Sequence, residues 1–326
     1  KLFGLTFKKL ENVPLPHAEA QAFEVFDNDG TVTGIVFFDM FARPGQKRSG
    51  AWCGSFRGQS YKNGERVLPL VTICGNFTRP VGDKPALLTT DEVETFFHEF
   101  GHALHNLFSQ VKYSGLGGVE RDFVELPSQI MENWSLEPEM LRRYALHHRT
   151  NDPIPTQMIE KLQRSRHFNQ GFNTVELLAA SLTDMDIHTI ENYSPIDINE
   201  FERKMLNERR GLMEQIAPRY RYPYFSHIFD GGYSSGYYSY LWAEVLDKDA
   251  YQAFVESGDI FNKRIATDFR HKLLARGGEA DGMDLYRAFR GADPDRKPLL
   301  LGRGLIEEEP VVEEENKPTL TIQELE

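Results

Sequence analysis

The segment TTDEVETFFHEFGHALHNLF (89–108) contains residue types that can bind a metal ion and activate water. It holds His98, Glu99 and His102 in the pattern HExxH. In a helix, side chains four positions apart lie on one face, so both imidazoles can reach a single ion. Glu99 follows the first histidine and would lie beside that face, where its carboxylate can contact a metal-bound water. The pattern therefore predicts a hydrolytic zinc site, with Glu99 as general base.

A helix is expected to position these residues. Thr89 is followed by Glu92 three residues later, which is a capping box and predicts that the helix begins there. The same features are compatible with a core helix that contains two incidental histidines. Gly101 favours the metal site, because a glycine inside a helix costs about 1 kcal/mol and indicates a close approach of another segment. His105 is expected to pack or to support the site rather than to bind the ion.

A zinc hydrolase needs a third protein ligand and an open fourth position. The pattern HExxHxxGxxH is absent, because His105 and Phe108 occupy the places of its glycine and its third histidine. A carboxylate on a later helix, predicted at 120–134, is the alternative. The candidates are Glu120, Asp122, Glu125 and Glu132. Glu125 and Glu132 would share a helical face, but Pro127 lies between them and can kink the helix, so spacing does not choose among the four.

The elements around this helix change character along the chain. The first quarter is rich in β-branched and aromatic runs separated by turn residues, which predicts strands at 22–27, 31–41, 51–57 and 66–76. From Thr90 onward the apolar spacing is helical. The predicted helices are 91–109, 120–134, 138–149, 155–168, 171–192, 198–210, 235–256, 261–276 and 283–290. The fold class is therefore expected to be mostly α, of the α+β kind, with a small antiparallel sheet near the N-terminus.

Charge and composition exclude several classes of protein. The net charge is −12, of which residues 307–326 contribute −7, with eight glutamates and one lysine. We expect one domain over 1–306, β-rich in 1–80 and helical in 90–306, followed by an acidic, disordered tail at 307–326. No clustered basic segment is present, which argues against a nucleic-acid partner. No apolar run approaches the roughly 18 residues that span a membrane, which argues against a membrane partner.

The two cysteines, Cys53 and Cys74, lie in separate apolar segments without a CxxC spacing. We expect buried free thiols, which favours a reducing compartment such as the cytoplasm. The first residue is Lys1 rather than methionine, so the chain is expected to be part of a longer protein. A targeting signal would then lie outside it, which leaves the periplasm as an alternative.

Three separated motifs resemble those of the thimet oligopeptidase family of zinc peptidases. They are HEFGH (98–102), RDFVELPSQIMENW (121–134) and FSHIFDGGYSSGYYSYLW (225–242), and the similarity extends over nearly all of residues 1–305. The resemblance implies a zincin-like helical catalytic domain that binds one zinc ion. It further implies that Glu125 is the third ligand and that Glu132 orients a zinc-binding histidine through a hydrogen bond.

The resemblance also assigns roles within residues 225–242. It implies that His227, Tyr237 and Tyr240 are catalytic and that Tyr233, Gly231 and Gly232 bind substrate. The glycines would give the segment backbone freedom to close over a peptide. The alternative is that these tyrosines form only the aromatic face of a helix that leads to Trp242.

The activity implied is zinc-dependent hydrolysis of peptide bonds in short peptides. Residues 168–188 and the start LFGLTF are more similar to the peptidyl-dipeptidase branch, which releases C-terminal dipeptides, than to branches that cut internally. Relatives in the family are about twice this length, and their N-terminal half forms a channel wall. The expected partners are therefore short peptides and the N-terminal half of a longer chain. An endo-acting oligopeptidase and a non-catalytic fragment that binds zinc or peptide are the alternatives.

Overall fold

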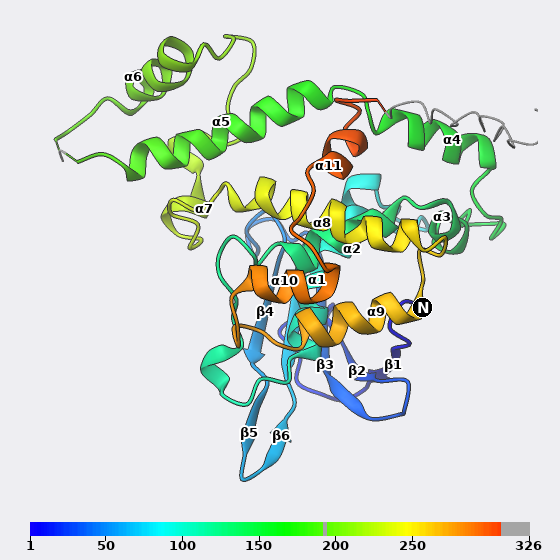
Figure 1. The fold of residues 1–326 in the computed structure, drawn as a ribbon. Coiled ribbons are helices and arrows are strands. Elements are labelled where there is room, and N and C mark those ends of the chain that lie inside the picture. The colour runs from blue at the N-terminus through cyan, green and yellow to red at the C-terminus, as the bar shows by residue number, and fades with distance from the viewer. Residues whose placement is uncertain (192–193, 308–326) are drawn as a thin grey trace, which may run out of the picture.

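A computed structural model describes residues 1–191 and 194–307, and its N-terminal part is a five-stranded sheet (Figure 1). The strands lie in the order β1 (Thr6–Leu10), β2 (Gln21–Phe26), β3 (Val32–Phe41), β7 (Leu70–Phe77) and β4 (Trp52–Arg57). A separate hairpin of β5 (Ser60–Lys62) and β6 (Glu65–Val67) projects from it. The four predicted strands are confirmed, although β1 and β5 were not predicted and the run 66–76 is divided between β6 and β7.

The expectation of an antiparallel sheet is wrong, because β3 and β7 pair in parallel. Parallel neighbours need a long connection, and residues 42–69 supply one. That connection contains β4, which crosses to the far side of β7 and pairs with it antiparallel. The result is a mixed sheet whose central pair, β3 and β7, was separated in the sequence by other strands.

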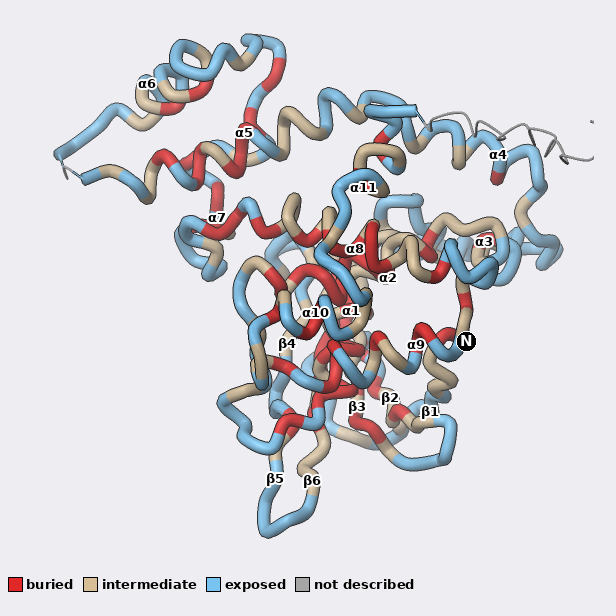
Figure 2. The backbone as a smooth tube through the Cα atoms, in the orientation of Figure 1, coloured by how far each residue is buried: buried red, intermediate tan, exposed pale blue. Residues whose placement is uncertain are grey.

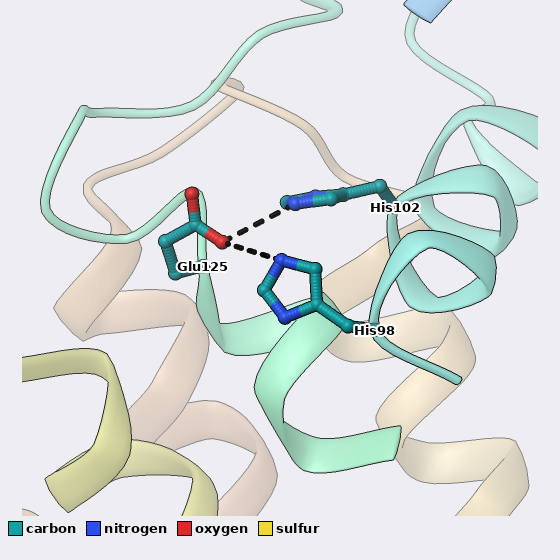
Figure 3. Close-up of side chains that lie close together, drawn as sticks. All are labelled: His98, His102 and Glu125. Carbon is teal, nitrogen blue, oxygen red and sulfur yellow. Dashed lines mark ion pairs between the residues drawn. The ribbon is translucent and has the colours of Figure 1, made fainter. Parts of the chain in front are cut away.

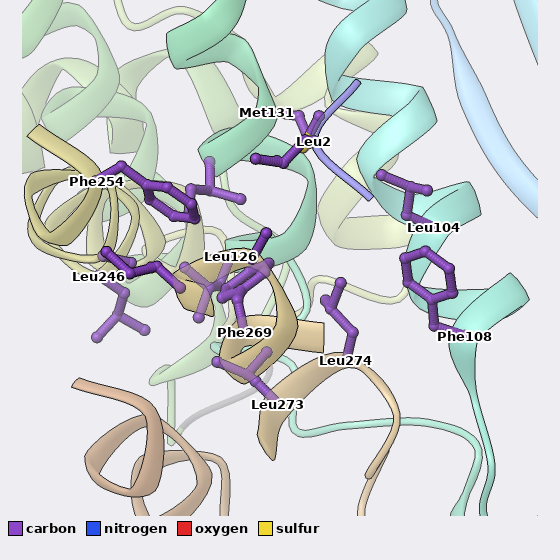
Figure 4. Packing of buried hydrophobic residues seen from close by; sticks show 14 of the residues in the cluster. Leu2, Leu104, Phe108, Leu126, Met131, Leu246, Phe254, Phe269, Leu273 and Leu274 are labelled. Carbon is purple, nitrogen blue, oxygen red and sulfur yellow. The ribbon is translucent and has the colours of Figure 1, made fainter. Parts of the chain in front are cut away.

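Helix α1 (Thr90–Phe108) lies between the sheet and the remaining helices. One side of it packs on the sheet, where Ala103 and Leu107 join a buried cluster with Val36 and Val71. Its other side faces helices, where Leu104 joins a larger core (Figure 4). That core also contains Phe108, Leu126, Ile130, Leu246, Phe254, Phe269 and Leu274. The helix with the HExxH pattern is thus held on two faces, and buried residues concentrate along it (Figure 2).

The other helices complete the architecture. They are α2 (Leu126–Ser135), α3 (Pro138–Tyr144), α4 (Thr156–Ser165), α5 (Gln170–His188), α6 (Ile198–Arg203), α7 (Ser226–Phe229), α8 (Ser239–Glu256), α9 (Lys263–Phe269), α10 (Gly282–Arg290) and α11 (Lys297–Gly302). Short 3-10 turns occupy Ser114–Leu116 and Tyr222–Tyr224, and π-helical turns follow α6 and α9 at Lys204–Glu208 and Arg270–Leu274. Helix α5 extends from the helical core toward α6, whose residues range from exposed to buried.

Most predicted helices are present, with shifted ends. The helix predicted at 120–134 begins only at Leu126, because Pro127 is tolerated in the first turn of a helix but not in its interior. The short helices α7 and α11 were not predicted. Cys53 and Cys74 are free, as predicted, although they are half-buried rather than buried. The acidic tail lies outside the described residues from position 308 onward, and the domain boundary at 306 stays a prediction.

Candidate metal centre

Helix α1 begins with the predicted capping box. The Thr89 hydroxyl accepts a hydrogen bond from the Glu92 N–H at 3.2 Å, and the Glu92 carboxylate accepts one from the Thr89 N–H at 2.9 Å. Two orphan donors at the helix start are thereby satisfied. Two turns further along, His98 and His102 project from one side of the helix with their ring centroids 5.0 Å apart. The HExxH spacing thus places both histidines on one side of the helix, as predicted.

Glu125, the residue immediately before α2, lies against both histidines (Figure 3). Its Oε2 lies 3.3 Å from His98 Nε2 and 3.2 Å from His102 Nε2. One ligand atom from each of the three residues lies within 4.8 Å of the others. The Ser128 hydroxyl fixes this carboxylate by lying 2.9 Å from Oε2 and 2.8 Å from the Glu125 carbonyl oxygen. Ser128 was not singled out in the sequence, although a hydroxyl three residues after a ligand is a usable signal.

The other three carboxylates considered as the third ligand make other contacts. Glu120 accepts a hydrogen bond from the Gly282 N–H at 3.3 Å, and Asp122 accepts one from the Tyr238 hydroxyl at 2.8 Å. Glu132 contacts His98, but at the other ring nitrogen, with 2.6 Å between its Oε1 and Nδ1. At that distance the Glu132 carboxylate accepts a hydrogen bond from Nδ1–H of His98, which leaves Nε2 as the ring atom that would bind a cation.

Burial and charge act against each other at these residues. Glu125 is 1% exposed, and burial alone would favour its neutral form. The imidazoles of His102 and His98 outweigh that effect and hold the pKa of Glu125 well below its usual range. The pKa of His98 is likewise opposed by burial but raised overall by Glu125 and Glu132. The cluster therefore favours the carboxylate anion of Glu125 beside a protonated His98. A cation bound here would keep that anion and displace the proton of His98.

Glu99 lies on α1 next to His98 and is 5% exposed. Within residues 1–191 and 194–307, its Oε2 has no hydrogen-bond partner. Burial raises the pKa of Glu99, and its charge is partly offset by His98 and His102. A buried carboxyl with a raised pKa and a free oxygen is suited to accept and return a proton.

The donor set fits a zinc ion. Two imidazole nitrogens and one carboxylate oxygen are a common protein ligand set for catalytic zinc, which keeps one position open. The three atoms converge, Glu132 supplies the outer hydrogen bond that such histidines usually make, and Glu99 leaves a buried acceptor beside them. Residues His98, His102 and Glu125 would therefore hold the ion.

The segment 225–242 places an aromatic cluster next to these ligands. His227 lies in α7, and its ring is 6.0, 5.5 and 6.2 Å, centroid to centroid, from the rings of Tyr233, Tyr237 and Tyr240. The rings of Tyr233 and Tyr240 stack at 5.3 Å. The Tyr233 hydroxyl donates a hydrogen bond to Glu125 Oε1, so Tyr233 connects the cluster to the proposed metal ligands.

The members of this cluster differ in burial. Tyr237 is 3% exposed and packs with Ala180, Phe225 and Ile228, whereas Tyr240 is half-buried. Burial raises the pKa of Tyr237 and of Tyr240 further above the ordinary value of 10, so both phenols stay protonated as donors. Residues 234–238 form turns, and helix α8 begins at Ser239 rather than at 235. Gly232 has a φ of +77°, which favours glycine at that turn.

An interaction that the sequence did not reveal holds the loop between α7 and α8 (residues 230–238) in place. Asp184 in α5 is fully buried and accepts hydrogen bonds from the backbone N–H groups of Ser235 (2.9 Å) and Tyr237 (2.8 Å). A buried aspartate in the apolar run LLAASLTDM was the available signal. Gln129 in α2 adds a second tie by donating to the Tyr240 carbonyl oxygen at 3.0 Å.

Residues 1–305 match the profile of Peptidase family M3. The chain belongs to this family. The match confirms the resemblance to the thimet oligopeptidase family that three motifs had indicated. It includes every residue of the candidate metal centre and of the aromatic cluster.

Two curated relatives of this M3 chain carry different names. A dipeptidyl carboxypeptidase of Salmonella typhimurium is 42% identical over 94% of this chain and 45% of its own length. Oligopeptidase A of the same organism is 38% identical over 94% of this chain and 45% of its own length. The chain thus spans less than half of these relatives.

Among solved structures, PZ peptidase A with an inhibitor has a TM-score of 0.51 at 16% identity, covering 82% of this chain and 42% of that one. This similarity shows that the M3 chain shares its fold with part of a peptidase. Among the described residues, no helix is both long and apolar enough to cross a membrane.

Proposed function

We propose that this chain is the zinc-binding catalytic part of an M3 peptidase that hydrolyses short peptides and releases C-terminal dipeptides. The observation that supports the proposal most directly is the convergence of His98, His102 and Glu125, with the free oxygen of Glu99 beside them. The 42% identity to a dipeptidyl carboxypeptidase favours dipeptide release.

The side chains divide the chemistry among them. A zinc ion held by His98, His102 and Glu125 supplies Lewis acidity, which polarises a carbonyl group and acidifies water. Glu99 takes a proton from the attacking water and returns it to the leaving amine, as its buried position and raised pKa favour. Glu132 keeps the His98 ring in the tautomer that presents Nε2 to the cation.

The aromatic cluster would stabilise the carbonyl oxygen of the peptide bond that is cleaved. In this proposal, His227, Tyr237 and Tyr240 donate hydrogen bonds to the negative charge that develops there, each contributing about 3–4 kcal/mol to the transition state. Tyr233, Gly231 and Gly232 contact the peptide. The N-terminal half of a longer chain, which relatives of about twice the length possess, would complete the walls around the substrate.

Two alternatives follow from specific observations. The 38% identity to oligopeptidase A favours internal cleavage of the same short peptides. The coverage of only 45% of the relatives favours a fragment that binds zinc or peptide without turnover.

The test replaces Glu99 by Gln and compares the variant with Glu160→Gln, an exposed glutamate of α4. We expect Glu99→Gln to retain one zinc per chain while hydrolysis of a quenched peptide falls by at least ~100-fold. Glu160→Gln should keep both. Loss of zinc from Glu99→Gln would make this residue a ligand, and undiminished hydrolysis would exclude it as the base. A parent chain that binds zinc but cleaves no peptide would favour the non-catalytic fragment.

A further inference from the structure

Arg121 precedes the ligand Glu125 by four residues and lies exposed at the edge of the aromatic cluster. Its guanidinium carbon is 4.5 Å from the centroid of the Tyr233 ring, a cation–π contact. Among residues 1–191 and 194–307, it forms no hydrogen bond or ion pair with another side chain. Its neighbours Glu120 and Asp122 are directed to Gly282 and Tyr238 instead. The cation next to the site is therefore not neutralised by the acids beside it.

Two glycines of the loop make room for this arginine. A Cβ at Gly232 would lie 3.1 Å from Arg121 Nη2, and a Cβ at Gly236 would lie 3.1 Å from Arg121 Cγ. The arginine side chain therefore lies along the loop, with its guanidinium over the Tyr233 ring. A guanidinium held in this way presents a planar pair of N–H donors, which matches the two oxygens of a carboxylate.

The position of Arg121 also bears on how far a carboxylate bound there would lie from the proposed metal ligands. Tyr233 contacts Arg121 through its ring and donates its hydroxyl hydrogen to Glu125. The arginine is thus separated from a proposed metal ligand by one phenol ring and one hydrogen bond. Two residues of extended peptide span about 7 Å, and the guanidinium lies 4.5 Å from the Tyr233 ring whose hydroxyl reaches Glu125, so the two ends that a dipeptide would bridge lie on either side of one phenol. A carboxylate bound at Arg121 would then end a peptide two residues beyond the bond being cleaved.

We propose that Arg121 binds the C-terminal carboxylate of the substrate and so determines that a dipeptide is released. This inference rests on the proposed function and specifies its substrate class as peptides with a free C-terminus. The rival cation is Arg219, which lies near Tyr220 and Tyr237 of the same region. It is the natural comparison, because it is also an arginine near the tyrosines but does not contact Tyr233.

The first experiment measures binding without turnover. The zinc-loaded Glu99→Gln protein is titrated calorimetrically with the dipeptide Ala-Ala and with its C-terminal amide. We expect the free acid to bind at least ~10-fold more tightly than the amide. Adding Arg121→Gln should remove that preference, whereas adding Arg219→Gln should preserve it. Equal binding of the two ligands, no binding of the free acid, or a preference that survives Arg121→Gln would each overturn the proposal.

The second experiment measures cleavage and separates the two proposals. The parent is given an N-blocked pentapeptide with either a free or an amidated C-terminus, and products are identified by mass spectrometry. We expect release of the C-terminal dipeptide from the free acid, at least ~10-fold faster than from the amide, and loss of this preference in Arg121→Gln. Cleavage of both peptides at equal rates by the parent would overturn the role of Arg121 while supporting a peptidase. Cleavage of neither would refute the proposed activity, and the binding experiment would still decide the role of Arg121.

Discussion

Gly101 in α1 lies so close to Pro127 in α2 that a Cβ at position 101 would be 2.1 Å from the Pro127 carbonyl oxygen. The same Cβ would lie 2.6 Å from the Cα of Ser128. Both contacts are shorter than a real Cβ tolerates, and both involve backbone atoms that cannot rotate away. The two helix backbones therefore touch inside the HExxH pattern, directly after Glu125, and only glycine permits this crossing.

Replacing Gly101 by Ala should separate α1 from α2. We expect a loss of about 1–3 kcal/mol of unfolding free energy from overpacking, and weaker zinc binding because Glu125 moves away from His98. Urea unfolding and a chelator competition measure the two effects. The control is Gly171→Ala in α5, where a Cβ meets nothing within 4 Å and should be neutral or slightly stabilising. Equal unfolding free energies and zinc affinities in the two variants would contradict the close crossing of α1 and α2.

The sequence predicted the parts of this site that depend on one segment. The capping box, α1 and the shared face of His98 and His102 all follow from spacing within 89–108. Gly101 predicted a close approach but not its partner, because the partner lies on another helix. The choice of Glu125 over Asp122 came from resemblance, since it depends on how α2 begins and crosses α1.

The features that were wrong or missed depend on contacts between distant segments. Strands β3 and β7 are 28 residues apart and pair in parallel, which no local pattern encodes. Asp184 holds the backbone of Tyr237 from 53 residues away. Such pairings are decided by the packing of whole elements, so composition and periodicity did not show them.

Substitutions of the three carboxylates near α2 should differ in how much they weaken zinc affinity. Glu125→Ala removes a proposed ligand, and we expect it to weaken zinc binding most. Glu132→Ala removes the hydrogen bond to His98 Nδ1 and should cost roughly 10–100-fold in affinity. Asp122→Ala, whose carboxylate bonds to Tyr238, should bind zinc as the parent does. Competition with a fluorescent chelator gives the three constants, and parental affinity in Glu125→Ala would exclude it as the third ligand.

Asp184→Asn should disturb the aromatic cluster without touching the metal. Asparagine has one carbonyl oxygen, so it cannot accept from both Ser235 and Tyr237 as the carboxylate does. We expect a loss of about 1–3 kcal/mol in stability and a lower kcat at unchanged zinc content.

The control for this change is Asp186→Asn on the same helix. Asp186 is also buried, but it pairs with Arg210 rather than with the loop. It should lower stability by a similar amount and leave kcat at the parental value. If both variants lowered kcat equally at matched stability, Asp184 would be a general structural residue and not a positioning residue for the loop.

His105 predicts a fall in stability on acidification. It is 8% exposed, and within the described ranges its Nε2 has no hydrogen-bond partner. Burial lowers the pKa of His105 from its ordinary 6.5 to about 4. Because the folded pKa is the lower one, the unfolded chain takes up a proton below pH 6.5 while the folded chain stays neutral. The stabilisation is therefore complete above pH 6.5 and is lost as the pH falls from 6.5 to about 4.

Between pH 7.5 and 5.5, this linkage corresponds to roughly 1 kcal/mol of unfolding free energy. The zinc-free protein is unfolded in urea at both values, so that the metal does not contribute to the difference. His105→Leu should reduce the fall between the two pH values by about that amount, because no proton can be taken up at position 105. His148→Leu, at an exposed position, should show the full parental fall. A His105 imidazole that titrates near pH 6.5 in the NMR spectrum of the folded parent would refute the buried neutral state, whatever the stability of the leucine variant.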